Sequence, residues 1–372
     1  MGRMHEPADP MARALALAGD ARSVSEPNPR VGCVIVSAQG EVLGQGHTQR
    51  AGEAHAEVMA LRDAQARGHS VAGATVYVTL EPCAHHGRTP PCADALVAAR
   101  VGKVVASIAD PNPRVNGHGF DKLRAAGIDV VIGPGAAEAL EINRGFFSRM
   151  IRRKPWVRMK VAATLDGRTA MADGRSQWIT SEAARLDGHQ WRARASAVLT
   201  GIGTVAADDP RLDARGHAVQ LQPALVLVDS RLECRADAKI FGPERRRFVY
   251  TASESDAILA RGDLQALGVE TIRLADAWGK VDLAAMMADL AARQMNEIHV
   301  EAGYRLNGSL IRAGLVDELL LYAAPRLLDE GMGIARLPGM SLDAAPEWAF
   351  VSADLIGSDV RLIARRRDAG RF

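Results

Sequence analysis

Apolar and polar positions alternate along the first 150 residues with two different periods. Short apolar runs, typical of buried strands, lie at 31–37, 41–48, 74–80, 103–108 and 128–133. Between them the apolar residues have helical spacing, which predicts helices at 12–21, 55–68, 91–100 and 119–127. Strands and helices that alternate with short connections predict an α/β layered sheet.

The pattern breaks near residue 150 and then resumes. The basic stretch 148–155 ends in a proline, so we expect a linker there. Further strand-like runs lie at 156–164, 196–201, 223–230, 246–251, 297–303 and 317–325. Helical patterns between them lie at 181–194, 282–293 and 305–313. The chain is therefore expected to form two α/β domains, residues 1–150 and residues 151–372.

Composition excludes several classes of protein. With 48% hydrophobic and 24% charged residues the chain is ordinary for a globular protein, which excludes wholesale disorder. Its 46 basic and 44 acidic residues leave a net charge of +2, so nothing draws it generally to nucleic acid or to an anionic membrane. No apolar run reaches the ~20 residues of a membrane span, and the N-terminus lacks a signal-peptide pattern. We therefore expect a cytoplasmic protein without nucleic-acid or membrane partners.

One histidine and two cysteines stand at element boundaries in a pattern that suits a metal. His55 opens a predicted helix, Cys83 follows a predicted strand, and Cys92 opens the next helix. One imidazole and two thiolates leave the fourth tetrahedral position of a zinc ion for water, as in catalytic zinc sites. Glu57 is then placed to move a proton rather than to bind the metal. His-x-Glu followed by two Pro-Cys pairs is the signature of zinc-dependent nucleobase deaminases.

Other interpretations of these residues stay open. His55 could be a helix histidine with satisfied hydrogen bonds beside two buried cysteines, or the three residues could form a structural zinc site. His85 and His86 lie close enough in sequence to be rival ligands. Cys33 sits among aliphatic residues in a predicted strand and is interpreted as a small buried hydrophobe. Cys234 is assigned no role.

The spacing of the cysteines points to a narrower family. Eight residues separate them, where the general deaminase pattern has two. The run TLEPCAHHGRTPPCADAL (79–96) lies between PNPRVGCVIV (27–36) and ADPNPRVNGHG (109–119). Together these motifs resemble the deaminase half of the bifunctional riboflavin biosynthesis enzymes. Such enzymes pair a diaminohydroxyphosphoribosylaminopyrimidine deaminase with a 5-amino-6-(5-phosphoribosylamino)uracil reductase, and the resemblance covers nearly the whole chain.

By this resemblance the first half has a cytidine-deaminase-like three-layer α/β/α fold. Its zinc ligands would be His55, Cys83 and Cys92, and its proton carrier would be Glu57. The substrate would be a small pyrimidinone that carries a phosphoribosylamino group and loses one exocyclic amine. The loop residues expected to bind it are Asn28, Arg88, Asp110 and Asn112. Arg88 suits a phosphate, although Asn-Pro and Asp-Pro pairs also favour turns without any ligand.

A glycine-rich turn in the second half suggests a dinucleotide. Gly201, Gly203 and Ala206 follow a predicted strand in the pattern G-x-G-x-x-A, which lets backbone N–H groups approach a pyrophosphate. Taken alone the pattern is weak, because the acidic residue expected ~20 positions later is poorly placed. A tight strand–helix turn without a ligand also explains these glycines.

The resemblance to the riboflavin enzymes changes this interpretation, because their reductase halves are similar to dihydrofolate reductase rather than to Rossmann domains. The motifs that carry it are KVAATLDGRTA (160–170), GRSQWITS (174–181), TVAADDPRLDAR (204–215), VDSR (228–231) and VEAGYRLNGSL (300–310). They imply a dihydrofolate-reductase-like α/β domain that binds NADPH. The implied dinucleotide contacts are Ala162, Trp178, Thr204, Asp208, Ser230 and a turn formed by Gly303, Tyr304, Arg305, Leu306, Asn307, Gly308 and Ser309. The implied contacts of the sugar phosphate are Ser176, Arg192, Leu212, Arg215 and Glu301.

Two further residues suit the reduction itself. Hydride transfer from NADPH to C1′ of the ring-opened ribosylamine calls for a nearby acid or cation. Lys160, one of only six lysines, lies in an apolar strand, and Glu301 ends another strand, so both are catalytic candidates. Simpler interpretations are an edge-strand lysine that blocks aggregation and a solvated strand-end carboxylate. Arg192 and Arg215 could likewise form surface ion pairs.

The leading hypothesis is a bifunctional riboflavin biosynthesis enzyme that uses Zn²⁺ for deamination and NADPH for reduction. One alternative is a zinc deaminase of the tRNA or nucleobase type with an accessory domain, which the near-neutral charge disfavours. Another is a zinc-stabilised binding module without activity, in which Glu57 has no task. We expect a homo-oligomer, a dimer or a tetramer.

Overall fold

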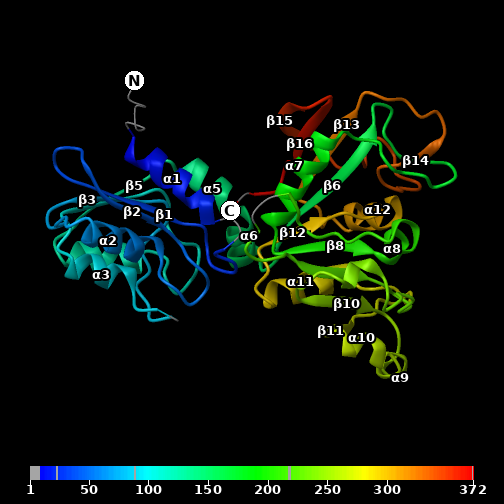
Figure 1. The fold of residues 1–372 in the computed structure, drawn as a ribbon, viewed down its shortest axis with the longest axis horizontal. Coiled ribbons are helices and arrows are strands. Elements are labelled where there is room, and N and C mark those ends of the chain that lie inside the picture. Colours follow the sequence, from blue (N-terminus) through cyan, green and yellow to red (C-terminus); the bar gives the residue numbers. More distant parts are fainter. Residues whose placement is uncertain (1–8, 22–23, 88, 217–218, 371) are drawn as a thin grey trace. The chain divides into compact units, whose positions relative to one another are not determined.

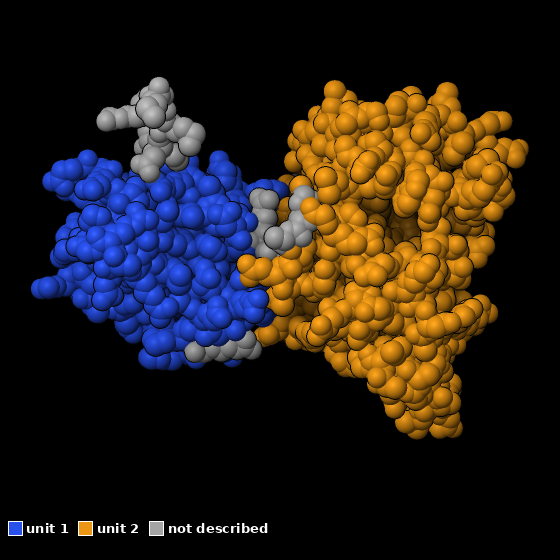
Figure 2. Space-filling model, in the orientation of Figure 1, with its two compact units in different colours: residues 1–152 blue, residues 153–372 orange. Residues whose placement is uncertain are grey.

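The computed structural model describes residues 9–21, 24–87, 89–216, 219–370 and 372. The chain divides into two compact units, residues 1–152 and residues 153–372, coloured separately in Figure 2. Figure 1 labels the helices and strands of each unit. No helix within the described ranges has the length and apolar character needed to cross a membrane.

The first unit is built on one five-stranded sheet. Its strands are β1 (Gly32–Val36), β2 (Val42–His47), β3 (Thr75–Val78), β4 (Lys103–Ala106) and β5 (Asp129–Ile132), in the order β2-β1-β3-β4-β5. Strand β1 is antiparallel to both β2 and β3, whereas β3, β4 and β5 are parallel. All five strands were predicted from the apolar runs.

Helices cover both faces of this sheet (Figure 1). They are α1 (Pro10–Asp20), α2 (Ala56–Ala66), α3 (Cys92–Ala98), α4 (His118–Ala125), α5 (Ala136–Ile142) and α6 (Arg144–Arg152). A Cβ on Gly32 would lie 1.9 Å from the carbonyl oxygen of Ala14 in α1, and a Cβ on Gly46 would lie 2.4 Å from Cβ of Met59 in α2. Gly46 pairs with Cys33, the neighbour of Gly32, so these two glycines face opposite sides of the sheet. The predicted three-layer α/β/α arrangement is confirmed.

The basic stretch before the second unit is not an open linker. Helix α6 runs to Arg152 and buries Phe146, Phe147 and Ser148. The prediction of a linker over 148–155 was therefore wrong for its first half. Basic residues misled it because Arg149 and Arg152 occupy the last turn of a helix, where cations are favoured by the helix dipole.

The second unit is built on a nine-stranded sheet in the order β11-β10-β9-β8-β12-β6-β13-β16-β15. Its predicted strands are β6 (Trp156–Thr164), β8 (Ala197–Gly201), β9 (Ala224–Val228), β10 (Arg247–Thr251), β12 (Glu297–Val300) and β13 (Glu318–Ala324). The strands that were not predicted are β11 (Val269–Arg273), β15 (Trp348–Ile356) and β16 (Asp359–Arg366). Seven strands, from β11 to β13 in this order, are parallel, and β16 and β15 add an antiparallel edge.

Helices and a small second sheet complete this unit. The helices are α7 (Glu182–Ala193), α8 (Ile202–Asp208), η2 (Lys239–Phe241), α9 (Ser255–Leu259), α10 (Gly262–Ala266), α11 (Leu283–Ala292) and α12 (Tyr304–Arg312). Strands β7 (Arg168–Met171) and β14 (Gly331–Gly333) pair with each other. The largest apolar core lies along the parallel strands and includes Met159, Leu199, Val226 and Ile298. Near-continuous apolar runs, such as that of β9, are expected in a parallel sheet that is covered on both faces.

The topology positions the candidate site residues of the second unit. Strands β6, β8, β9 and β12 are mutually parallel, so their carboxyl ends meet at one edge of the sheet. Ala162 lies in the last third of β6, the segment from Gly201 to Thr204 leaves β8, Ser230 follows β9, and Glu301 follows β12. Ligands of open α/β sheets bind at this edge.

Candidate active sites

His55, Cys83 and Cys92 come together in the first unit. Their ligand atoms all lie within 4.8 Å of one another, and within the described residues no other group of histidine, cysteine or acidic side chains is arranged to hold a metal. His55 Nδ1 lies 3.7 Å from Cys83 Sγ and 3.3 Å from Cys92 Sγ. The rival ligands His85 and His86 are outside this cluster.

Element ends hold the three side chains in place. His55 is the extended residue before α2, and Cys92 is the first residue of α3. The backbone N–H of Cys92 donates to Cys83 Sγ at 3.3 Å, and the carbonyl of Cys83 accepts from Ala93. Hydrogen bonds from Cys92 and His55 lower the pKa of the Cys83 thiol to about 4, and the bond to Cys83 raises the pKa of His55. The cluster therefore favours a thiolate, the form that binds metal.

The donor set fits zinc. An imidazole and two thiol groups of which one is readily ionised are the ligands that a catalytic zinc ion takes, with one tetrahedral position left open. A structural site would need a fourth protein ligand at this cluster, and the described residues supply three.

Glu57 lies in the first turn of α2, beside this cluster. Its side chain is only 3% exposed, and its carboxylate interacts with Cys92. Burial, helped by the negative charge of Cys83, raises the pKa of Glu57 to about 7. A buried carboxyl group with such a pKa can both accept and return a proton near neutral pH.

Glu81 connects the zinc cluster to the loop that follows β4. Its buried carboxylate accepts backbone N–H bonds from Asp110 (3.1 Å), Gly117 (3.0 Å) and Gly119 (2.9 Å). A Cβ on Gly119 would lie 2.0 Å from the carbonyl oxygen of Pro82, so only glycine allows this close approach. The prediction from sequence missed Glu81, although an acidic residue directly before Pro-Cys at a strand end was the available signal.

The structure describes three of the four predicted substrate residues of the first unit. Asp110 is buried, and burial together with Glu81 raises its pKa to about 7, although its carboxylate also accepts the N–H of Asn112 at 2.8 Å. Asn112 in turn accepts the N–H of Arg114, and Asn28 lies in the loop before β1 with its backbone bonded to Ser25. The side-chain oxygens of Asp110 and Asn112 thus accept hydrogen bonds from the backbone of their own loop. Arg88 lies outside the described residues.

Lys160, Glu301 and Arg192 form one partly buried ion cluster in the second unit. Lys160 Nζ lies 3.5 Å from Glu301 Oε2, and Arg192 grips both oxygens of the same carboxylate, one of them through Nη2 at 2.9 Å. Burial alone would raise the pKa of Glu301, but Arg192 and Lys160 hold it well below its ordinary value. Lys160 also lies over the ring of Tyr322, 5.9 Å from its centroid. Glu301 is therefore not a solvated strand-end carboxylate, and Lys160, on β6 between β12 and β13, is not an edge-strand lysine.

A buried ion ladder continues along the same face of the sheet. Arg158 lies two residues before Lys160 on β6 and pairs with Glu297 of β12 at 3.0 Å and with Glu318 of β13. His299, between Glu297 and Glu301, is fully buried with Nε2 3.4 Å from Glu301 Oε1. Sequence alone missed this ladder, because charged residues in central strands are expected on exposed faces.

Two groups of predicted dinucleotide residues are neighbours at the carboxyl edge of the sheet. A Cβ on Gly303 would lie 3.7 Å from Thr204 Oγ1, and a Cβ on Gly201 would lie 3.0 Å from Leu306, so the turns after β8 and β12 are neighbours. Asp208, at the end of α8, accepts a hydrogen bond from Ser176 at 3.2 Å. These contacts bring predicted cofactor and substrate residues together.

Three other predicted residues stand at the margins of this group. Trp178 is exposed and stacks with Arg185, whose guanidinium carbon lies 4.5 Å from the ring centroid. Ser230 Oγ accepts the N–H of Val281 at 3.2 Å. Ala162 pairs with Tyr322 across β6 and β13.

The segment Gly303–Ser309 is not the turn that the resemblance implied, and the helix predicted at 305–313 from the apolar pattern is confirmed. Gly303 precedes α12, which includes Tyr304, Arg305, Leu306, Asn307, Gly308 and Ser309. Asn307 is buried and donates to the carbonyl of Ile334, and a Cβ on Gly308 would lie 2.0 Å from the carbonyl of Arg336. These two residues therefore pack against chain 334–336, and the helix start at Gly303 faces Thr204. The glycine pattern misled the prediction because Gly308 serves helix packing.

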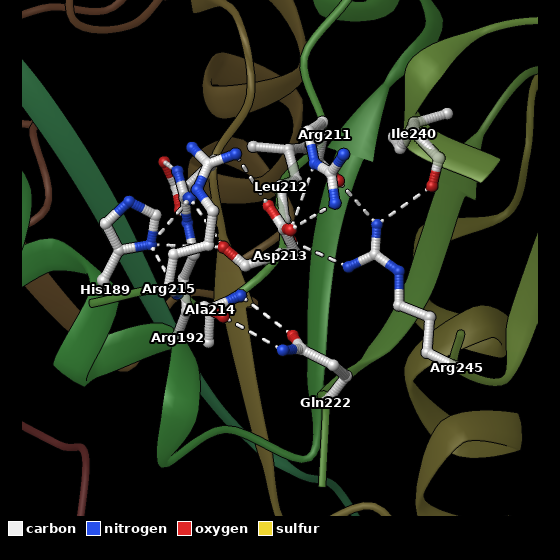
Figure 3. A network of polar contacts seen from close by, with 11 residues as sticks. His189, Arg192, Arg211, Leu212, Asp213, Ala214, Arg215, Gln222, Ile240 and Arg245 are labelled. Atoms are coloured by element: carbon white, nitrogen blue, oxygen red, sulfur yellow. Dashed lines mark hydrogen bonds and ion pairs between the residues drawn. The ribbon is translucent and has the colours of Figure 1, made fainter. Parts of the chain in front are cut away.

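The loop Arg211–Arg215 brings two more predicted residues to the Glu301 cluster. Arg192 Nη1 donates to the carbonyl of Asp213 at 3.0 Å, and His189 accepts the N–H of Arg215 at 3.2 Å (Figure 3). Leu212 is buried in the neighbouring apolar cluster. Figure 3 also shows Arg245 and Gln222 reaching this loop, and the prediction from sequence named neither.

Comparisons with known proteins find matches for both units. Residues 155–362 match the RibD C-terminal domain, and residues 4–108 match the cytidine and deoxycytidylate deaminase zinc-binding region. The chain is 46% identical over 360 residues to riboflavin biosynthesis protein RibD of Escherichia coli, covering 95% of this chain and 97% of that protein.

Two solved structures are similar over nearly the full length. Form 1 of Acinetobacter baumannii RibD has a TM-score of 0.87 at 39% identity, covering 96% of this chain and 98% of that one. A diaminohydroxyphosphoribosylaminopyrimidine deaminase/5-amino-6-(5-phosphoribosylamino)uracil reductase from Thermotoga maritima has a TM-score of 0.85 at 29% identity, covering 96% and 98%. This chain belongs to the RibD family of riboflavin biosynthesis proteins.

Proposed function

We propose that this protein carries out two consecutive steps on one small substrate. It removes an amine by hydrolysis from 2,5-diamino-6-(5-phosphoribosylamino)pyrimidin-4-one, and it then reduces the ribosyl chain of the product to ribityl with NADPH. The observation that carries the proposal is the cluster of His55, Cys83 and Cys92 beside the buried Glu57. The second match, to the RibD C-terminal domain over residues 155–362, supports the reduction.

In the first unit the chain's own residues hold the metal and move the proton. His55, Cys83 and Cys92 are the zinc ligands, and zinc supplies Lewis acidity that makes a hydrolytic water more acidic. Glu57 accepts one proton from that water and passes it to the ring nitrogen; it then moves the second proton of the water to the amine, which departs as ammonia. Asp110, Asn112, Asn28 and Arg88 bind the base and the sugar phosphate, with Glu81 holding the loop of the first two in place.

In the second unit the carboxyl edge of the sheet takes NADPH. The residues that would contact it are Ala162, Trp178, Thr204, Asp208, Ser230 and the first turns of α12 from Gly303 to Ser309. NADPH supplies a hydride for C1′ of the open-chain imine, and the imine nitrogen gains a proton, which leaves a ribitylamine.

The ion cluster of this unit acts on the sugar. Lys160 and Glu301 lie 3.5 Å apart and form a fixed cation–anion pair that orients the ribosyl chain and stabilises charge as it develops. Ser176, Arg192, Leu212 and Arg215 hold the sugar phosphate, and Glu301 also contacts the ribose. The hydrogen bond from Ser176 to Asp208 places this binding region beside the cofactor residues.

Residues 1–150 would carry out the deamination, and residues 151–372 would carry out the reduction. The protein would act in the cytoplasm as a homo-oligomer, a dimer or a tetramer. The four free cysteines support a reducing compartment. The edge strand β15, with Phe350 and Leu355 exposed at 76% and 78%, supports self-association. A tRNA-type deaminase is not favoured, because more than half of the chain then has no task.

The test is incubation of the full chain with the phosphoribosylaminopyrimidinone, with and without NADPH, followed by mass analysis. Without NADPH the substrate should gain about 1 Da as the amine becomes a carbonyl. With NADPH a further gain of about 2 Da should follow. An unchanged substrate mass with a folded, zinc-loaded chain would contradict the deaminase assignment. A first product that NADPH leaves unchanged would contradict the reductase assignment.

A further inference from the structure

Side chains from outside the loop Arg211–Arg215 bond to six of its backbone N–H and carbonyl groups. The carbonyl of Asp213 accepts from Arg192, and the N–H of Arg215 is bonded to His189 (Figure 3). Both backbone groups of Ala214 are bonded to one side chain, that of Gln222. A surface loop normally leaves such groups to water. This loop is therefore preset in one conformation before any ligand arrives.

Arg245 makes the strongest of these attachments. It lies between η2 and β10 and is only 9% exposed. Its Nη1 donates to the carbonyl of Leu212 at 2.7 Å, and its Nη2 donates to the carbonyls of Arg211 at 2.8 Å and Ile240 at 3.0 Å. Burial lowers the pKa of Arg245 to about 10, so the guanidinium stays charged at neutral pH. A charged donor shared by three carbonyls fixes the first half of the loop to the body of the unit.

Leu212 shows what this attachment holds in place. Its φ is +50°, a left-handed conformation that a non-glycine residue rarely adopts. This backbone turns its carbonyl toward Arg245 while its side chain stays in the apolar cluster with Leu225 and Ile240. Without Arg245 the carbonyl of Leu212 would lose its charged donor, and this hydrogen bond would no longer stabilise the left-handed backbone.

Gln222 fixes the second half of the loop. Its side-chain oxygen accepts the N–H of Ala214 at 2.9 Å, and its amide nitrogen donates to the carbonyl of Ala214 at 2.9 Å. This two-point contact has the geometry of a strand pair and sets the direction in which the next residue, Arg215, leaves the loop.

The preset loop presents two arginines to solvent. Arg211 and Arg215 are 52% and 53% exposed, and both pair with the carboxylate of Asp213, which is 6% exposed. Asp213 can balance one of the two positive charges, so a net positive charge remains at the surface of the loop. Paired guanidinium groups on a rigid backbone suit a phosphate, which accepts several hydrogen bonds from fixed directions.

We propose that Arg245 and Gln222 are positioning residues for the reductase site, because they preset the Arg211–Arg215 loop to receive the substrate's phosphate. This inference rests on the proposed reduction of a phosphoribosyl substrate. Neither residue touches the substrate: Arg245 is buried behind the loop, and Gln222 is occupied by Ala214. Because Arg245 and Gln222 order the loop in advance, the loop loses little conformational entropy when it binds the phosphate, whereas a flexible loop would lose more.

The experiment compares steady-state reduction by the full chain and by the variants Arg245→Gln and Gln222→Ala. The control is Arg246→Gln, because Arg246 is the neighbouring arginine and is exposed. Each protein is assayed with two substrates: the deaminated phosphoribosyl compound and the same compound without its phosphate. NADPH binding is measured separately to show that the unit is folded.

Arg245→Gln should raise KM for the phosphorylated substrate at least about tenfold, since a shift of about 1 Å in a positioning group can cost up to ~100-fold. Its kcat and its affinity for NADPH should stay within about twofold, and kcat/KM for the dephosphorylated compound should hardly change. Gln222→Ala should show the same pattern at about three- to tenfold. Arg246→Gln should match the wild type on both substrates.

Three results would overturn the inference. One is an unchanged KM for the phosphorylated substrate in Arg245→Gln and Gln222→Ala. Another is an equal loss on both substrates, which indicates a merely structural role. If Arg245→Gln fails to bind NADPH, the same criteria apply to Gln222→Ala alone. The third is a wild type that reduces both substrates equally well, which would mean that the loop is not a phosphate site, although the reductase function stands. A wild type that reduces neither compound refutes the proposed reductase itself.

Discussion

Replacing Glu81 by glutamine tests how the deaminase site is held together. Its carboxylate accepts the backbone N–H groups of Asp110 and Gly117 in the loop before α4 and of Gly119 in the first turn of α4, and it is almost fully buried. Glutamine has nearly the same shape but only one acceptor oxygen. If that oxygen keeps the bonds from Asp110 and Gly117, the amide nitrogen faces the N–H of Gly119, and two donors then oppose each other.

The expected cost follows from these contacts. A buried N–H without an acceptor costs about 1–3 kcal/mol, and each of the two bonds that loses its charged acceptor weakens by about 1 kcal/mol. Removing a buried negative charge next to Asp110 returns part of this. We therefore expect the loop between β4 and α4 to open more easily by about 2–3 kcal/mol, which is a factor of roughly 30–150 in its local opening equilibrium.

Hydrogen exchange measures this directly. The amides of Gly117 and Gly119 should exchange roughly 30–150 times faster in Glu81→Gln, and ammonia release should fall because Asp110 and Asn112 are no longer held in place. Zinc content and NADPH-dependent reduction should be unchanged, because neither the proposed zinc ligands nor the proposed reductase residues lie on this loop. Glu53→Gln, at an exposed carboxylate of the same unit, is the control. Unchanged exchange at both glycines with full ammonia release would refute the proposed role of Glu81.

Three further predictions address other parts of the chain. Glu57→Gln should keep its zinc and lower ammonia release by about 10²–10⁴-fold, because the proton carrier is lost; ammonia release at the wild-type rate would contradict that role. Gly32→Ala should destabilise the first unit by roughly 1–3 kcal/mol in chemical unfolding, because its Cβ would lie 1.9 Å from the carbonyl of Ala14. Gly87→Ala, whose Cβ would meet nothing closer than 3.7 Å, should be neutral, and equal stability of the two variants would count against the packing argument. Burial and the nearby Arg192 and Arg215 lower the pKa of His189 to about 4 from 6.5. Between these values the unfolded chain binds more protons, so His189 makes the second unit less stable as the pH falls from 6.5 to about 4, and has no such effect above that window. His189→Gln should make the melting temperature of the second unit depend less on pH in this window. The transition of the second unit is identified by its stabilisation on adding NADPH. Identical slopes of melting temperature against pH in the variant and the wild type would show that His189 does not titrate as described.

The sequence predicted those elements whose pattern is set by burial. Strands β9 and β10 are buried along almost their whole length, so the apolar runs 223–230 and 246–251 identified them within a few residues. Strands β15 and β16 escaped because they form an edge: Phe350 and Leu355 face solvent, and Arg361 and Arg365 interrupt the apolar pattern. An edge strand does not need the alternation that a half-buried strand shows.

Site residues were predictable where their chemistry is local in sequence. His55, Glu57 and the two Pro-Cys pairs stand at element ends, and the structure brings the three metal donors within 4.8 Å. Residues that act through the backbone gave no such signal. Glu81 and Arg245 bind main-chain groups that lie 29 to 38 and 5 to 34 positions away, and only the folded chain brings these groups together.

The central claim is that His55, Cys83 and Cys92 hold a zinc ion on which deamination depends. Metal analysis of the purified chain, combined with ammonia release before and after chelation, tests it most directly. We predict about one zinc ion per chain, loss of ammonia release when a chelator removes it, and recovery when zinc is restored. Full ammonia release from a folded chain without zinc would contradict the account.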